Sequence, residues 1–256
     1  MIWKKIKTCI ENCFTKEEED RPPRSAVEDM GSVTGWRVTE PKLFYPDAER
    51  MDEGQKTLGL YRNKYPEGAV IHYTAGNGSL EGDSKFAKEA GYNYFIIDKL
   101  GKIAQLAPLD RWGYHAGKSS CPLGKSVSRF LVGIEVVCAG KLERKECEGI
   151  DGKYVTYRTW WGKAVHESDV RSFRYSSRRG QHIRSFEKFT CAQEDALQKL
   201  LLWLKNNNPK VFQFDNVFAH SEVSPGRKID PGVSFSQTMP FYRKNLKQSR
   251  IAGHIT

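Results

Sequence analysis

The strongest constraint on the fold is the apolar run Phe130-Leu-Val-Gly-Ile-Glu-Val-Val, residues 130–137. A run of this length and composition is typical of a β-strand that is buried on both faces. It is too short to cross a bilayer. A strand covered on both faces needs packed layers on either side of its sheet, so the run predicts the centre of a layered domain.

The segments around this run alternate between strand and helix patterns. Helical patterns cover 81–90 and the segment after Thr190, where Thr190 and Gln193 form a capping box ahead of a leucine stripe. Alternation of this kind predicts an α/β fold with a mixed central β-sheet flanked by helices. The further strands are expected at 69–73, 92–98, 103–106 and 217–220, the second and third of them as a hairpin.

The composition fits one sizeable domain, because the chain has 256 residues and 39% of them are hydrophobic. We expect residues 1–25 to form a short amphipathic segment and linker, and residues 26–256 to form the domain. The first residues lack the apolar stretch of a secretory signal, so we expect synthesis in the cytoplasm. Six cysteines without a Cys-x-x-Cys pair indicate neither a disulfide scaffold nor a zinc knuckle. Cys138 and Cys191 are expected in the core.

The formal net charge is +10, and half of it lies in one stretch. Residues 141–190 hold 12 Lys and Arg against 7 Asp and Glu, a difference of +5. We interpret this stretch as an insertion between the buried strand and the capped helix, with a charge suited to an anionic surface. Its aromatic residues include Trp160 and Trp161, which either stack on sugars or pack the insertion; the sequence favours neither reading.

Several polar side chains stand where strands end. His72 and His220 each close a predicted strand, and Lys228 and Asp230 are two residues apart, so in extended backbone they face the same way. Two histidines and a carboxylate suit a zinc ion with an open fourth position. Each residue also has a plainer reading, because a histidine at a strand end is more often a surface residue. Taken alone, Glu135 in an apolar strand is best explained as the partner of a buried Lys or Arg.

Four motifs that occur in a defined order favour the functional interpretation of these residues over the plainer one. They are Ile71-His72-Tyr-Thr-Ala-Gly, Trp112-Gly-Tyr-His115-Ala-Gly117, Gly133-Ile-Glu135 and His220-x7-Lys228-x-Asp230-Pro-Gly. With them the chain resembles the zinc-dependent N-acetylmuramoyl-L-alanine amidases of the type 2 family, which are related to T7-type lysozyme and to peptidoglycan recognition proteins. The resemblance runs from about 68 to 245, and the insertion is only loosely matched.

The resemblance implies a role for each matched residue. His72, His220 and Asp230 correspond to the zinc ligands, Lys228 to the lysine that faces the developing oxyanion, and Glu135 to the general base. Some relatives use a tyrosine as the base, at a position that is Asn93 here, so the chain resembles the glutamate variety. The substrate contacts expected from the resemblance are His115, Thr74 and Asn93.

The implied function is hydrolysis of the bond between N-acetylmuramic acid and L-alanine in peptidoglycan, by a monomer. The alternative is a non-catalytic module that binds peptidoglycan or muramyl peptides; the full ligand set and Glu135 argue against it. The basic stretch raises nucleic-acid binding as a third reading, but no nucleic-acid motif is present and none is expected as a partner. The chain resembles phage lysis enzymes more than compact wall-recycling enzymes, so we expect action on the cell wall from the host periplasm.

Overall fold

The computed structural model describes residues 40–76, 78–149, 152–178 and 180–252. The amphipathic segment predicted at 1–25 lies outside these residues. Among the described residues, no helix combines the length and the apolar character needed to span a bilayer.

A six-stranded sheet forms the centre of the domain. Its middle strand β9 (Leu131–Val136) is the predicted apolar run, and it pairs in parallel with β3 (Gly68–Tyr73) and with β4 (Tyr94–Ile97). β4 also pairs antiparallel with β5, so the sheet is mixed, as the sequence predicted. The complete order is β1 (Ala48–Arg50), β5 (Ile103–Gln105), β4, β9, β3 and β15 (Val217–Ala219).

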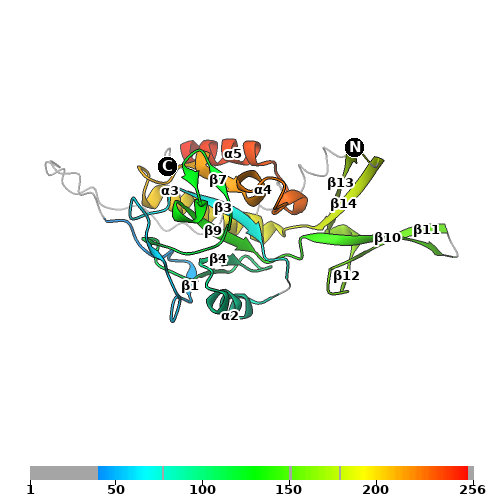
Figure 1. Cartoon of the computed structure of the whole chain (residues 1–256), viewed down its shortest axis with the longest axis horizontal. Helices are drawn as coiled ribbons and strands as arrows, with labels where there is room; N and C mark the ends of the chain where they lie inside the picture. Colours follow the sequence, from blue (N-terminus) through cyan, green and yellow to red (C-terminus); the bar gives the residue numbers. More distant parts are fainter. Residues whose placement is uncertain (1–39, 77, 150–151, 179, 253–256) are drawn as a thin grey trace, which may run out of the picture. The chain divides into compact units, whose positions relative to one another are not determined.

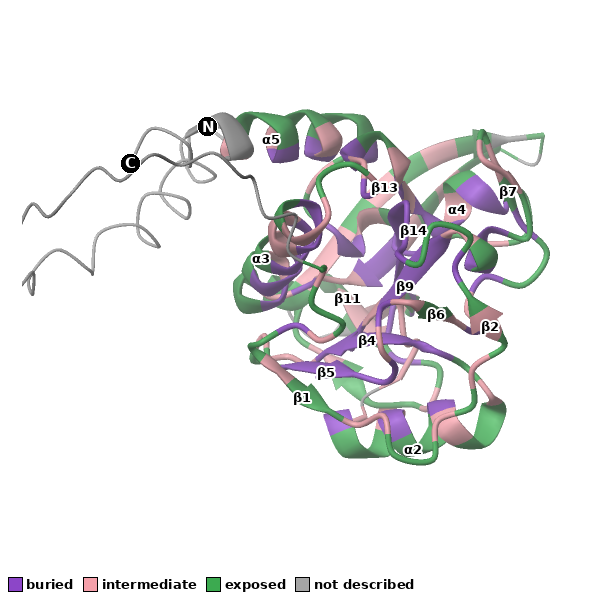
Figure 2. Ribbon diagram, turned by 90° about the vertical axis from the view of Figure 1, so that its left-hand side faces the viewer, coloured by how far each residue is buried: buried purple, intermediate pink, exposed green. Residues whose placement is uncertain are grey.

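Helices cover both faces of this sheet. Figure 1 shows α2 (Leu80–Ala90) on one side, and α3 (Cys191–Asn207) and α5 (Met239–Ala252) on the other. α3 begins as predicted, because the Thr190 hydroxyl accepts a hydrogen bond from the backbone N–H of Gln193 at 3.1 Å. Its leucine stripe is buried in the main apolar cluster, and Figure 2 shows the buried strands between the helices.

The remaining elements are short and connect the layers. They are β2 (Gly59–Leu60), β6 (Arg111–Trp112), β7 (Ser120–Cys121), β8 (Gly124–Lys125) and α4 (His220–Val223).

The two cysteines predicted to lie in the core differ in the structure. Cys138 is buried after β9, as predicted, whereas Cys191 is exposed, so its predicted place in the core was wrong. Cys191 is the first residue of α3, where it and Ala192 face solvent while Gln193 of the same turn faces the core.

The basic stretch forms an antiparallel sheet of its own. The chain leaves β9 into this sheet and returns from it directly before α3 (Figure 1). The strand order is β12 (Ala164–Val165), β11 (Gly152–Arg158), β10 (Lys141–Gly149), β14 (Gly180–Glu187) and β13 (Val170–Ser177). We call these strands and their turns the insertion sheet.

The insertion sheet is rooted on the segment that follows Asp230. The Arg171 guanidinium on β13 donates hydrogen bonds to the carbonyl oxygens of Val233 and Ser234, at 2.8 and 3.3 Å. The Phe186 ring on β14 lies against Gly232, where an added Cβ would come within 3.2 Å of the ring. The insertion therefore packs against the backbone two to four residues after a predicted metal ligand.

Candidate active site

The candidate site lies on the face of the sheet that α2 covers. His72 on β3 and Glu135 on β9 are register partners, so their side chains leave the sheet on the same face. This face carries two separate apolar clusters, one around Ile96 under α2 and one around Val70 and Leu131. The polar side chains occupy the sheet between them.

Three of these side chains converge on one point. His72 Nδ1 lies 2.9 Å from His220 Nδ1 and 3.2 Å from Asp230 Oδ2, and His220 Nδ1 lies 2.9 Å from the same carboxylate oxygen. All three residues are buried. The structure thus brings together the three residues that the sequence predicted as ligands, from β3, α4 and the loop before Gly232.

A chain of hydrogen bonds sets the tautomer of His72. His115 Nε2 lies 2.8 Å from the carbonyl oxygen of Leu131, which can only accept, so this nitrogen carries the proton. His115 Nδ1 is then the acceptor for His72 Nε2, at 3.2 Å. Burial lowers the pKa of His72 to about 4, so the ring is neutral at pH 7. A neutral ring that donates through Nε2 presents a bare lone pair at Nδ1.

His220 is oriented in the same way. Its Nε2 lies 3.1 Å from the carbonyl oxygen of Ala116, which only accepts, and 3.3 Å from Arg227 Nη2, which only donates. The shorter contact, to the carbonyl oxygen, places the proton on Nε2 and leaves Nδ1 as an acceptor. The Arg227 guanidinium donates to the same carbonyl oxygen at 2.6 Å and to the Ser224 hydroxyl at 2.8 Å. Arg227 thereby fixes the loop that orients His220, a role that no sequence motif indicated.

The triad is therefore built for a cation. Two imidazole lone pairs and one carboxylate oxygen face each other within about 3 Å with no donor among them. Buried acceptors in such contact need a positive group between them. Two nitrogens and one oxygen are a donor set that zinc accepts, and outer hydrogen bonds of this kind are what hold metal-bound histidines in position.

Glu135 lies beside this triad, with Oε1 4.0 Å from His72 Nδ1. Burial, together with the negative charge of Asp230, raises the pKa of Glu135 to about 8. Its Oε2 is buried without a hydrogen-bond partner among the described residues. A buried carboxyl with an unused oxygen is typical of a group that exchanges protons during a reaction.

Lys228 is partly buried, and its positive charge acts on both His72 and Glu135. Ile229 is exposed between Lys228 and Asp230, in keeping with the alternation expected for extended backbone. Asp83 on α2 was missed by the sequence analysis; its charge contributes to the raised pKa of Glu135.

The three predicted substrate contacts have partners within the protein. His115 bonds to His72, and its ring packs on Gly133, where an added Cβ would lie 2.7 Å from His115 Cγ. The Thr74 hydroxyl accepts from the backbone N–H groups of Gly76 and Cys138. Asn93 is buried against Gly113. Their contact with substrate stays a prediction.

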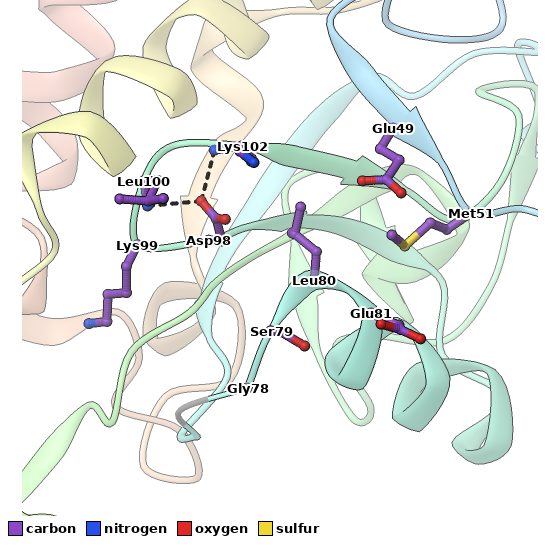
Figure 3. A pocket seen from close by; sticks show the side chains of 10 residues that line it. All are labelled: Glu49, Met51, Gly78, Ser79, Leu80, Glu81, Asp98, Lys99, Leu100 and Lys102. Carbon is purple, nitrogen blue, oxygen red and sulfur yellow. Dashed lines mark hydrogen bonds between the residues drawn. The ribbon is translucent and has the colours of Figure 1, made fainter.

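A cavity of about 420 Å³ lies elsewhere, between the start of α2 and the turn after β4. Figure 3 shows Asp98 in its wall, accepting hydrogen bonds from the backbone of Leu100 and Lys102. None of the converging site residues lines it. The cavity is therefore separate from the candidate active site.

A family model described as N-acetylmuramoyl-L-alanine amidase matches residues 62–233, a range that includes the triad, Glu135 and Lys228. The chain belongs to this family. The family match thus confirms the resemblance that the four motifs indicated for this amidase. A search of curated proteins finds no match.

Solved structures are similar to the amidase at the level of the fold. The crystal structure of a selenomethionine derivative of AmpD is 18% identical, with 82% of this chain and 99% of that chain covered and a TM-score of 0.50. AmiD from E. coli, in complex with anhydro-N-acetylmuramic acid-L-Ala-D-gamma-Glu-L-Lys, is 23% identical over 66% and 54% of the two chains, with a TM-score of 0.41. The endolysin amidase LysCS from Clostridium intestinale is 18% identical over 81% and 97%, with a TM-score of 0.43. The likeness to AmpD supports the mixed α/β fold.

His115 provides a test of how the triad is held. In His115→Ala, His72 Nε2 loses its acceptor, so we expect zinc affinity to fall about 10- to 100-fold, the usual cost of losing an outer partner of a metal ligand. Competition with a chromophoric chelator measures this. His166→Ala, an exposed histidine of the insertion, is the matched control and should bind zinc like the unaltered amidase. Equal affinity in His115→Ala would show that the hydrogen-bond chain does not support the site.

Glu135 predicts a pH dependence of the metal-free amidase. Its pKa is about 8 in the fold against 4.5 for a free side chain, so the folded state binds more protons between these values. This group therefore stabilises the fold below about pH 4.5, and its contribution is lost as the pH rises toward 8. Compared with Glu135→Gln, the unaltered metal-free protein should lose up to about 1.4 kcal/mol more per pH unit in this window. Urea unfolding at pH 5, 6.5 and 8 checks this, and parallel pH profiles would contradict it.

Proposed function

We propose that this chain cleaves the amide bond between the lactyl group of N-acetylmuramic acid and L-alanine, with a zinc ion held by His72, His220 and Asp230. The observation that carries the proposal is the convergence of three buried acceptor atoms beside a carboxyl group whose pKa is raised. Membership of the amidase family supplies the substrate class. Bound there, zinc would polarise the amide carbonyl and make a water more acidic.

Glu135 moves the proton in this proposal. The nitrogen of an amide is a poor leaving group unless it is protonated. A side chain must therefore take a proton from the attacking water and give it to that nitrogen. The buried carboxyl of Glu135 suits both steps, because its pKa lies close to neutrality. A cation in the triad, close to Glu135, would lower that pKa further toward the working range.

Lys228 stabilises the negative charge that develops on the carbonyl oxygen. Its ammonium group already acts on Glu135 and His72 through its charge, so it lies within electrostatic reach of the reacting bond. Such a donor stabilises charge that is present mainly in the transition state.

This role gives a prediction for Lys228→Met, which keeps most of the side-chain volume. We expect kcat to fall about 100- to 1,000-fold, the usual cost of removing one oxyanion donor. Zinc affinity should stay within a few-fold, because Lys228 is not a ligand. Initial rates and zinc competition, measured on the same preparations, test both parts. A loss of zinc in step with the loss of rate would contradict the assignment.

The proposal as a whole is tested with two substrates, purified sacculi and a soluble muramyl peptide. We expect the zinc-loaded protein to release stem peptides with a free L-alanine amino group, each product pair gaining one water in the mass spectrum. Product detection identifies the bond that is cut. A zinc-loaded protein that binds sacculi but releases no stem peptide would contradict the proposed hydrolysis and favour a non-catalytic binding module.

A further inference from the structure

The turn between β11 and β12, residues 159–163, has a conformation that is fixed by hydrogen bonds. The backbone N–H of Thr159 donates to the carbonyl oxygen of Lys163 at 2.8 Å, and the Thr159 hydroxyl accepts from the backbone N–H of Lys163 at 3.0 Å. Thr159 is buried. These bonds fix the turn, so the two tryptophans that it carries are presented in a defined way.

Trp160 reaches from this turn to the loop after β3. Its indole N–H donates to the carbonyl oxygen of Ala75 at 2.7 Å. The loop itself is tied to β9, because the backbone N–H of Thr74 donates to the carbonyl oxygen of Val136 at 3.1 Å. The contact therefore places Trp160 at the ends of the two strands that carry His72 and Glu135.

The indole of Trp160 is nevertheless open to solvent, with 74% of the residue exposed. Its orientation is held by the bond to Ala75 and by the Trp161 ring, which stands nearly perpendicular at 86° with a centroid distance of 5.3 Å. Among the described residues, no Lys or Arg side chain stacks over the Trp160 ring. Trp161 thus packs the turn, whereas Trp160 offers a fixed and uncovered aromatic face.

We propose that Trp160 is a platform for a sugar ring of the glycan strand, next to the muramoyl residue whose amide is cut. This rests on the proposed function, because the scissile bond joins a peptide to a sugar chain that must pass beside the site. A pyranose ring presents a flat face of C–H groups, which matches an exposed aromatic face held in one orientation. The insertion would thereby favour polymeric wall over small fragments.

Binding to sacculi tests the platform without turnover. In a Glu135→Gln background, pull-down on insoluble sacculi gives the fraction bound as a function of protein concentration. We expect Trp160→Ala to weaken binding about two- to tenfold, the range of one aromatic contact. Trp160→Phe keeps a ring face but loses the N–H donor that orients it against Ala75, so it should bind between Trp160→Ala and the parent. Gln181→Ala, an exposed and uncharged residue of the insertion sheet, is the control and should bind like the parent.

Turnover gives the second readout in the otherwise unaltered enzyme. The ratio of kcat/KM for sacculi to kcat/KM for a muramyl peptide with a single sugar should fall about two- to tenfold in Trp160→Ala. Binding of Trp160→Ala equal to the parent overturns the platform. So does an equal fall of Trp160→Ala and Trp160→Phe, since a ring face would then contribute nothing to binding. If the unaltered protein cuts neither substrate, the amidase proposal fails, while the pull-down still decides on the platform.

Discussion

Replacing Glu135 by glutamine is expected to lower kcat about 100- to 10,000-fold, the usual contribution of a positioned general base. Glutamine has nearly the same shape, but it cannot take up and return a proton. The zinc ligands are untouched, so metal content should equal that of the unaltered amidase. The free energy of unfolding at pH 8 should not decrease, because burial disfavours the charged form of Glu135. Stem-peptide release from a muramyl peptide, with zinc analysis of each preparation, measures the effect.

The matched control is Glu143→Gln, a carboxylate on the exposed surface of β10. It removes the same charge from the same chain and should retain full activity. Glu135→Gln with more than a tenth of the normal kcat would exclude Glu135 as the base. Loss of activity accompanied by loss of zinc would instead assign Glu135 to metal binding.

Removing the metal is expected to reduce stem-peptide release to background, and one equivalent of zinc should restore it. The fold should respond as well, because without a cation two lone pairs and a carboxylate are held together in a buried site. At a free zinc concentration of about 1,000 times the dissociation constant, binding adds about 4 kcal/mol to the free energy of unfolding. For a domain of this size that corresponds to a Tm increase of roughly 10 °C. Activity assays and calorimetry of chelator-treated and reloaded protein measure both effects.

Asp230→Ala separates the site from non-specific metal binding. It removes the carboxylate that contacts both histidines, so zinc should neither restore activity nor raise the Tm. A Tm increase in Asp230→Ala equal to that of the unaltered protein would place the stabilising ion elsewhere.

Local sequence patterns predicted the parts of the fold that depend on local chemistry. The apolar run around Ile134 is the central strand, and Thr190 and Gln193 cap α3 as expected. The exposure of Cys191 was missed because the polarity of a single residue does not show which side of the first helical turn faces the core. Periodicity is informative over several turns and not for one residue at an end.

The metal triad was predicted from the four ordered motifs and the family that they resemble, because strand ends alone left each histidine with a plainer interpretation. The structure shows why they meet: His72 lies near the end of β3, His220 follows β15, and these two strands are parallel neighbours whose carboxyl ends lie at one edge of the sheet. Alternation in extended backbone predicted only that Lys228 and Asp230 face the same way, and their roles came from the resemblance. Their convergence within about 3 Å came only from the structure.

The contacts that tie the insertion to the site had no signal in the sequence. The bond from Trp160 to Ala75 joins residues 85 positions apart, and that from Arg171 to Val233 joins residues 62 apart. The same holds for His115, whose partner His72 is 43 residues away. Pairings of this kind depend on tertiary packing, which propensity and periodicity do not encode.

The pairing of β15 with β3 joins the last strand of the central sheet to one of the earlier ones, with Ala219 opposite Ile71. His220 can therefore reach His72 only after nearly 150 intervening residues have been made. Contacts of such long range form late, because closing the chain between them costs entropy before any contact is gained. A nascent chain that has not yet reached Asp230 lacks one or more residues of the triad. In this amidase, hydrolytic competence therefore requires synthesis to have passed Asp230.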